Sequence, residues 1–419
     1  MSQFRSGIVG KIRRHGGIIQ NFSYLSVIQL VNLLVTLATY PFLIRVLGKE
    51  VFGLVVYAQA IITYLVVLIS FGFQISATRE VSIHRNDPRK LNEIFSSVLI
   101  LKGLLFLASV GLLFLITLFI PQAREHKVLF LLSMFTCFYE FIFPFWFFQG
   151  IEKMGYLTLI TLITKLTFFI LIFLFIRSKK DYLLVPLFNG IGSVLAGVIS
   201  IWIAVVREKV RFSFQPFHRL WHYFRESSAL FVSNFANQVY VNANKVIVGL
   251  SLGMGEVALY DLAEKIVLAM KIPQNMLNQA IFPKIIKERN VAFSKKILLY
   301  SMVGQAAFFF LIVLTSSVLV LLLGGREMSQ STGLLRLLAL TVPVNAISSF
   351  LGIQFLVAHG FKRLYTRVIV LSVVLYALMC TGLWVNGSIS LISVILATIA
   401  TEVFGLVAMM VMVGRRRLG

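Results

Sequence analysis

Charged residues are scarce in this chain. Only 13% of its 419 residues are Asp, Glu, Lys or Arg, whereas soluble globular domains carry about 25%. Hydrophobic residues make up 58% of the sequence, and no polar stretch is long enough to form a separate soluble domain. This composition excludes an ordinary soluble fold and indicates a protein embedded in a lipid bilayer.

Cysteine and the common catalytic motifs are also scarce or missing. The two cysteines, Cys137 and Cys380, fall within apolar stretches, so neither suggests a disulfide framework or a metal site. The sequence has no glycine-rich phosphate-binding loop. Of its six histidines, His218 and His222 are four residues apart, but they lack a nearby cysteine or an HExxH context and are expected as interfacial residues. We therefore expect neither enzymatic activity nor a bound metal or cofactor.

Acidic residues are much fewer than basic ones. The chain has 16 Asp and Glu against 39 Lys and Arg, a formal net charge of +23. In a soluble protein this excess would suggest nucleic acid as a partner, but no separate basic domain exists to bind it. The basic residues instead gather in every second connection between apolar stretches, as the positive-inside rule requires of membrane proteins. We expect the lipid bilayer, and no nucleic acid, as the partner.

The apolar stretches predict an all-α integral membrane protein of about twelve helices, because about 20 helical residues cross a bilayer. The expected spans are 21–44, 52–76, 94–119, 128–148, 155–176, 182–206, 226–249, 256–283, 297–323, 332–358, 365–385 and 389–413. With the N-terminus inside, the cytoplasmic segments hold roughly 24 Lys and Arg and the outer connections roughly 8. We therefore expect an inner-membrane protein with both termini in the cytoplasm.

A polar connection near the middle of the chain divides the spans into two sets of six. We expect an N-terminal lobe at 1–206, a cytoplasmic connecting loop at 207–225 and a C-terminal lobe at 226–419. The halves show faint similarity at an offset of 205, which places Gly48 on Gly253. Such parallel repeats recur in transporters, where the substrate binds at the interface between the halves.

Polar residues inside the spans are the candidates for function, because a charge at mid-bilayer costs at least about 2.5 kcal/mol. The repeat aligns two pairs of amides, which are expected as polar lining or as helix–helix hydrogen-bonding groups: Asn32 with Asn237 and Gln74 with Gln279. The charged candidates are Lys102, Lys165, Lys245, Lys265 and Lys271 as cavity cations, and Glu140, Asp261, Glu264 and Glu402 as ion-coupling or paired acids.

Each charge also has a purely structural interpretation. Asp261 and Lys265 are four residues apart on one predicted helix and can cancel each other's charge. Lys102 and Lys245 lie near the ends of their spans and can extend to the membrane surface. Lys271, by contrast, has no acidic residue one turn away on its own helix.

Lys165 lies near the middle of its span and has less access to the surface. An ion pair with Glu140 or Glu402 is the structural alternative for Lys165. The functional alternative is a water-filled cavity in which lysines bind an anionic substrate and acids bind H⁺ or Na⁺.

Two motifs resemble the Wzx-type O-antigen flippases, the polysaccharide transporter branch of the superfamily that also contains the MATE multidrug exporters. The first motif is met by Pro41, Arg45, Leu47–Gly48 and Phe52–Gly53. The second, W-x-x-Q-G-x-E-x-M, is met by Trp146, Gln149, Gly150, Glu152 and Met154. The similarity extends over nearly the whole chain.

The resemblance implies two six-helix lobes around a cavity that opens alternately to each side of the membrane. It also implies transport of an undecaprenyl-diphosphate-linked oligosaccharide from the cytoplasmic to the periplasmic leaflet, with ion-coupled antiport suggested for some members. In such a cavity Lys165, Lys265 and Lys271 would replace the hydration of the diphosphate. A polysaccharide polymerase and a chain-length regulator are further candidate partners.

Three other functions remain open from the sequence. A MATE-like exporter of organic cations should favour acids in its spans, but about six bases stand there against four acids. A membrane polysaccharide polymerase or ligase should carry a sizeable outer loop, and the outer connections here are short. A non-transporting scaffold would need no polar lining. The sugar of the substrate cannot be read from the sequence.

Overall fold

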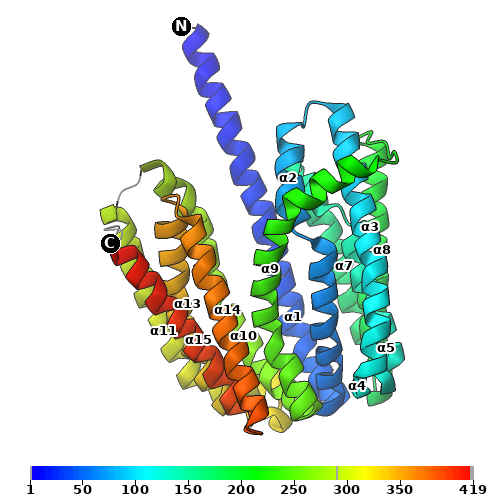
Figure 1. The fold of residues 1–419 in the computed structure, drawn as a ribbon, viewed down its shortest axis with the longest axis vertical. Helices are drawn as coiled ribbons and strands as arrows, with labels where there is room; N and C mark the ends of the chain where they lie inside the picture. Colours follow the sequence, from blue (N-terminus) through cyan, green and yellow to red (C-terminus); the bar gives the residue numbers. More distant parts are fainter. Residues whose placement is uncertain (1, 289–290, 416–419) are drawn as a thin grey trace. The chain divides into compact units, whose positions relative to one another are not determined.

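The fold is a set of long helices (Figure 1). The computed structural model describes the backbone of residues 2–288 and 291–415, and their side chains except at 2–23, 25–26 and scattered positions between 233 and 292. All regular structure in this described part is helical, which confirms the all-α prediction. The α-helices are α1 (Ser2–Ser70), α2 (Phe73–Ile83), α3 (Pro88–Phe119), α4 (Pro121–Glu125), α5 (Lys127–Ile142), α6 (Phe145–Gly150), α7 (Met154–Phe175), α8 (Leu184–Val206), α9 (Phe217–Ser251), α10 (Met254–Glu288), α11 (Val291–Gly324), α12 (Ser331–Ala339), α13 (Thr341–Phe350), α14 (Lys362–Val385) and α15 (Leu391–Arg415).

Many of these helices are long and apolar enough to cross a bilayer. Nine such helical segments occur within the described residues, and one of them, Val27–Ile83, holds 57 residues. That length would be about 85 Å of continuous helix, so it corresponds to more than one crossing. The chain is a multi-pass membrane protein, while the count of twelve spans stays a prediction.

The two glycines that the predicted repeat aligns, Gly48 and Gly253, both have positive φ angles. Gly48 interrupts α1 with φ 74° and ψ 164°, a conformation that is essentially restricted to glycine. Gly253, 205 residues later, has φ 126° between α9 and α10. Both halves therefore turn from one helix into the next at a glycine in a left-handed conformation, as the sequence predicted.

Three predicted spans are interrupted. The second one, 52–76, breaks at Phe71 and Gly72, whose φ angles are 40° and 76°. The fourth one, 128–148, breaks at Pro144, which has no backbone N–H to continue the helix. The tenth one, 332–358, consists of α12, α13 and a π-helical segment, Leu351–Val357. Apolar composition alone did not reveal these breaks.

The connection between the sixth and seventh spans is shorter than expected. α9 begins at Phe217, inside the predicted loop 207–225. The Pro216 carbonyl accepts hydrogen bonds from the N–H groups of Arg219 and Leu220, which starts the helix. His218, His222 and the aromatic residues from Phe217 onward therefore belong to a helix.

Contacts group the chain into two compact units. Unit 1 comprises Met1–Phe42 and Ile61–Phe235, and unit 2 comprises Leu43–Ala60 and Ala236–Gly419. In unit 1, α8 packs against α5 and α7, and α2 packs against α6. In unit 2, α10 packs against α12, α13 against α15, and α14 against α15. The predicted lobes at 1–206 and 226–419 stay a prediction, because this grouping follows contacts and not the order of the spans.

Leu43–Ala60 is fixed within unit 2 by close backbone packing. A Cβ atom on Gly53 would lie 1.7 Å from the carbonyl oxygen of Met254, at the start of α10. No side chain fits in that space, so this position of the first motif requires glycine.

Candidate functional site

Unit 2 encloses an ionic cluster made of three of the predicted residues. The Lys245 ammonium on α9 lies 3.0 Å from Asp261 Oδ1 and 2.6 Å from Glu264 Oε2, both on α10. The three side chains are 7%, 1% and 11% exposed. The cluster therefore joins two helices through charges that the protein itself neutralises.

A neutral polar network continues from this cluster. The Asn244 amide donates to the Tyr260 hydroxyl at 2.6 Å and to Thr398 Oγ1 at 3.0 Å. Its carbonyl oxygen accepts a hydrogen bond from the Tyr376 hydroxyl. The Tyr260 hydroxyl lies 3.5 Å from Glu264 Oε1. Four helices, α9, α10, α14 and α15, are thus linked around one buried amide.

A second ionic site in unit 2 borders a cavity. Lys271 on α10 lies 3.2 Å from Glu402 Oε1 on α15. The other carboxylate oxygen, Oε2, is buried without a hydrogen-bond partner among the described residues. Glu402 lines a cavity of about 180 Å³ together with the polar residues Asn345, Ser348, Ser349, Tyr365, Ser372 and Thr401. This site combines a buried acid with room for water or a small ion.

The predicted lysines of unit 1 have two different environments. Lys102 on α3 is 3% exposed and lies 2.8 Å from Glu140 Oε1 on α5. Lys165 on α7 is half-buried and has no ion-pair partner among the described residues of unit 1. Lys102 is therefore neutralised by an acid of its own unit, whereas a role for Lys165 in binding an anion stays a prediction.

These contacts correct several structural interpretations of the sequence. Glu140 pairs with Lys102 rather than with Lys165, and Glu402 has a partner, Lys271, within its own unit. Lys102 does not extend to the membrane surface, because its side chain is buried in an ion pair. Partners from neighbouring helices, which periodicity along one helix cannot reveal, determine each of these pairings.

The environment of Lys245 differs from both roles that the sequence suggested for it, extension to the membrane surface and binding of substrate. Lys245 neither extends to the membrane surface nor stands free for substrate, because Asp261 and Glu264 enclose it. Lys265 is half-buried on α10, and its role in binding stays a prediction.

The predicted polar lining is only partly described. Asn32 is half-buried on α1, while the side chains of Asn237 and Gln279 lie outside the described residues. Gln74 of α2 and Gln149 of α6 line the same recess in unit 1. The structure therefore brings one predicted lining residue next to a residue of the second motif.

Several motif residues stabilise the fold. Arg45 donates to the Leu322 carbonyl at 2.7 Å, one of the last carbonyls of α11, which lack helical partners. Pro41 lies inside α1. Glu152 has φ 61° and lies 3.1 Å from Arg85 in an exposed ion pair. The Arg45 contact assigns a capping role to one residue that the sequence could only identify as a signature.

Sequence reasoning missed the neutral hub of unit 2. Asn244, Tyr260, Tyr376 and Thr398 are common residue types in membrane helices, and nothing in their spacing shows that they meet. The one available signal was the pair Asn244–Lys245, two adjacent polar residues in an apolar stretch. Within the described residues, no group of His, Cys, Asp and Glu is placed to hold a metal ion.

Comparison with known proteins identifies the family. The pattern of a family described as "Polysaccharide biosynthesis protein" matches residues 18–289. A protein of Escherichia coli (strain K12) named "Putative O-antigen transporter" is 26% identical over 358 residues, covering 84% of this chain and 86% of that protein. A Shigella dysenteriae protein of the same name is 26% identical over 368 residues, covering 86% and 91%.

Solved structures share the fold. An inward-facing MATE family multidrug transporter aligns with a TM-score of 0.72 at 14% identity, covering 92% of this chain and 94% of that one. The lipid II flippase MurJ, in an inward closed conformation, aligns with a TM-score of 0.71 at 16% identity, covering 93% and 87%. The resemblance to flippases found in the motifs is confirmed, and the fold is that of the MATE and MurJ transporters.

The ionic cluster yields a first prediction. Lys245→Met would leave two buried carboxylates without their cation, and breaking a buried pair in this way costs about 3–5 kcal/mol. We expect a marked drop in the thermal unfolding temperature of the purified protein. Replacing the acids too, with Asp261→Asn and Glu264→Gln, should restore much of the loss.

The matched control is Lys49→Met, which removes a pair with Glu50 whose two side chains are 29% and 64% exposed. That change should cost at most about 1 kcal/mol. An unchanged unfolding temperature for Lys245→Met, together with lost transport, would contradict the structural role and return Lys245 to the substrate site.

Proposed function

The chain belongs to the polysaccharide biosynthesis protein family, and we propose that it carries an undecaprenyl-diphosphate-linked oligosaccharide from the cytoplasmic to the periplasmic leaflet of the bacterial inner membrane. The family match over residues 18–289 carries this proposal. The two relatives named as O-antigen transporters support it, and both are transporters by name, not enzymes. In this proposal both termini face the cytoplasm. That the protein acts together with a polysaccharide polymerase and a chain-length regulator stays a prediction.

The chemistry of the substrate explains why a protein is needed. A diphosphate and sugar hydroxyls would lose their water in the hydrocarbon core. The free-energy cost of this desolvation prevents the substrate from crossing without a protein. A transporter must replace that hydration with its own polar groups, and it must also open to each side in turn. Ion-coupled alternating access is the mechanism we propose.

Lys165 is the best-placed cation for the diphosphate. Lys102, Lys245 and Lys271 are each neutralised by a carboxylate within their own unit. Lys165 is half-buried on a membrane helix and lacks such a partner among the described residues. A hydrogen bond between an ammonium and a phosphate oxygen is about twice as strong as a neutral one. This environment supports a substrate-binding role for Lys165.

Glu402 is the best-placed group for ion coupling. Its Oε1 holds Lys271, and its Oε2 is buried beside the polar cavity without a described partner. A proton on Oε2, or a Na⁺ ion in the cavity, would complete the coordination of the carboxylate. We propose that uptake and release of this cation bias the protein between its two orientations. Asp261 and Glu264 share the Lys245 ammonium, and neither lines this cavity.

Deletion of the gene in its host tests the transport function. We expect loss of surface polysaccharide and accumulation of the lipid-linked repeat unit on the cytoplasmic face, with full recovery on re-expression of the wild-type chain. The measurements are a polysaccharide ladder on gels and mass spectrometry of extracted lipids. Normal polysaccharide with altered sensitivity to cationic drugs would instead favour a MATE-like exporter.

Replacement of Lys165 tests the phosphate anchor. Lys165→Met should lower surface polysaccharide about tenfold or more in the complemented deletion strain, because a charge-assisted hydrogen bond is lost. Lys165→Arg keeps the cation and should retain most of the transport. Equal activity of the Met and Arg variants, at equal protein levels, would remove Lys165 from the substrate site.

Replacement of Glu402 tests the coupling site. Glu402→Gln cannot release a proton, so substrate-dependent proton or Na⁺ flux into proteoliposomes should be abolished. Lys271→Met combined with Glu402→Gln keeps the site neutral and should show the same loss with a stable fold. The control is Glu327→Gln, an exposed acid in a short helical turn after α11. Normal ion flux in the Glu402 variants would refute the assignment.

A further inference from the structure

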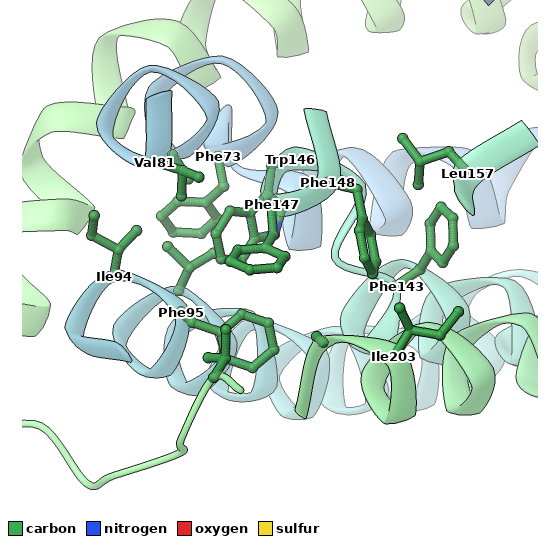
Figure 2. Packing of buried hydrophobic residues seen from close by; sticks show 14 of the residues in the cluster. Phe73, Val81, Ile94, Phe95, Phe143, Trp146, Phe147, Phe148, Leu157 and Ile203 are labelled. Carbon is green, nitrogen blue, oxygen red and sulfur yellow. The ribbon is translucent and has the colours of Figure 1, made fainter. Parts of the chain in front are cut away.

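The second motif builds a tight junction between two short helices of unit 1. Trp146 of α6 is 3% exposed, and its ring lies 5.8 Å from Phe95 on α3. Figure 2 shows Trp146 and Phe147 beside Phe73 and Phe95 in one aromatic cluster. This cluster fixes α6 at a defined position beside α2.

Gly150 brings the two helices into direct contact. A Cβ atom at this position would lie 2.5 Å from Val81 Cγ1 and 3.0 Å from the Thr78 carbonyl oxygen, both on α2. The Thr78 hydroxyl lies 3.2 Å from the carbonyl oxygen of Trp146. The glycine and this hydrogen bond hold α6 against α2, and Gln149 is carried to the same side as the polar residues of α2.

An open recess of about 620 Å³ lies beside this junction. It is lined by six polar residues and one apolar one: Ser70, Gln74, Ile75, Thr78, Arg79, Ser82 and Gln149. The recess begins where the second span breaks at Phe71 and Gly72, so the break directs α2 along its wall. A volume of this size is in the range of small-ligand sites, about 300–1,000 Å³.

The two carboxamides in the recess have unused hydrogen-bonding groups. Neither the Gln74 nor the Gln149 side chain makes a hydrogen bond to another described residue. Each carboxamide offers two N–H donors and one carbonyl acceptor, and the hydroxyls of Ser70 and Ser82 offer both functions. The Thr78 hydroxyl donates to backbone carbonyls and offers its oxygen as an acceptor. This mixture matches sugar hydroxyls, each of which is a donor and an acceptor.

The charge of the recess favours a neutral ligand. Arg79 is its one charged residue, and Arg79 lies 3.3 Å from Glu226 in an ion pair. A diphosphate would need an unpaired cation, which this ion pair does not supply. Neutral amides and hydroxyls are better suited to an uncharged saccharide.

We infer that the recess formed by α2 and α6 binds the sugar of the lipid-linked substrate, with Gln74 and Gln149 as its hydrogen-bonding residues. The inference rests on the proposed function and adds to it a separate subsite for the oligosaccharide. Lys165 then binds the diphosphate, and the two amides form hydrogen bonds with hydroxyl groups of the sugar. The second motif contributes to sugar binding because it positions Gln149.

The test is equilibrium binding to the full chain in nanodiscs. The probes are the lipid-linked oligosaccharide extracted from the deletion strain and undecaprenyl diphosphate without sugar. We expect Gln74→Met and Gln149→Met to weaken binding of the glycosylated lipid about fivefold each, since each loses one hydrogen bond. Binding of undecaprenyl diphosphate should change by less than about twofold.

The matched control is Gln330→Met, an exposed glutamine at the start of α12 in unit 2, which should alter neither affinity. If a Met variant unfolds, Gln149→Asn, which withdraws the amide by one methylene group, replaces it. Unchanged binding of the glycosylated lipid by the chain that combines Gln74→Met with Gln149→Met, or equal losses for both lipids, would overturn the inference. If the wild-type chain bound neither lipid, the proposed function would fall, and the inference with it.

Discussion

The absence of water from the bilayer core is the constraint on which the rest of this structure depends. Every charge placed there must find a partner in the protein or a wet cavity. Lys102, Lys245 and Lys271 all find carboxylates on neighbouring helices. Ion pairs therefore act as contacts between helices in this chain, and a lysine without such a partner is the informative exception.

The fold could be predicted well from the sequence because its main signals are local. Apolar length defines the spans, and the glycines at 48 and 253 mark equivalent turns because no other residue adopts their backbone conformation without strain. The breaks at Phe71–Gly72 and Pro144 were missed, since flanking apolar residues conceal a short interruption. Local composition determines where the chain crosses the membrane, but not where a crossing is divided.

The site could be predicted only as a set of residue types. The sequence identified Lys245, Asp261 and Glu264 as candidates, yet their meeting depends on how α9 packs against α10. Likewise, Glu402 reaches Lys271 across 131 positions of the chain. Pairing between distant helices is a property of tertiary packing, so periodicity on one helix does not reveal it. Burial is equally non-local. Lys102 is more deeply buried than Lys165, although both are lysines in apolar spans.

The motifs that reveal the family consist largely of residues that stabilise the fold. A match to these motifs therefore identifies the fold but does not identify the substrate. Gly53 allows backbone contact with Met254, Arg45 binds the end of α11, and Gly150 allows contact with α2. Such residues are compatible with any substrate that a protein of this fold transports. Matching them identifies the architecture and leaves the substrate undetermined. Substrate choice must then reside in side chains that the scaffold positions but does not require. A sugar preference should therefore change through substitutions in the recess while the glycines beside it stay the same.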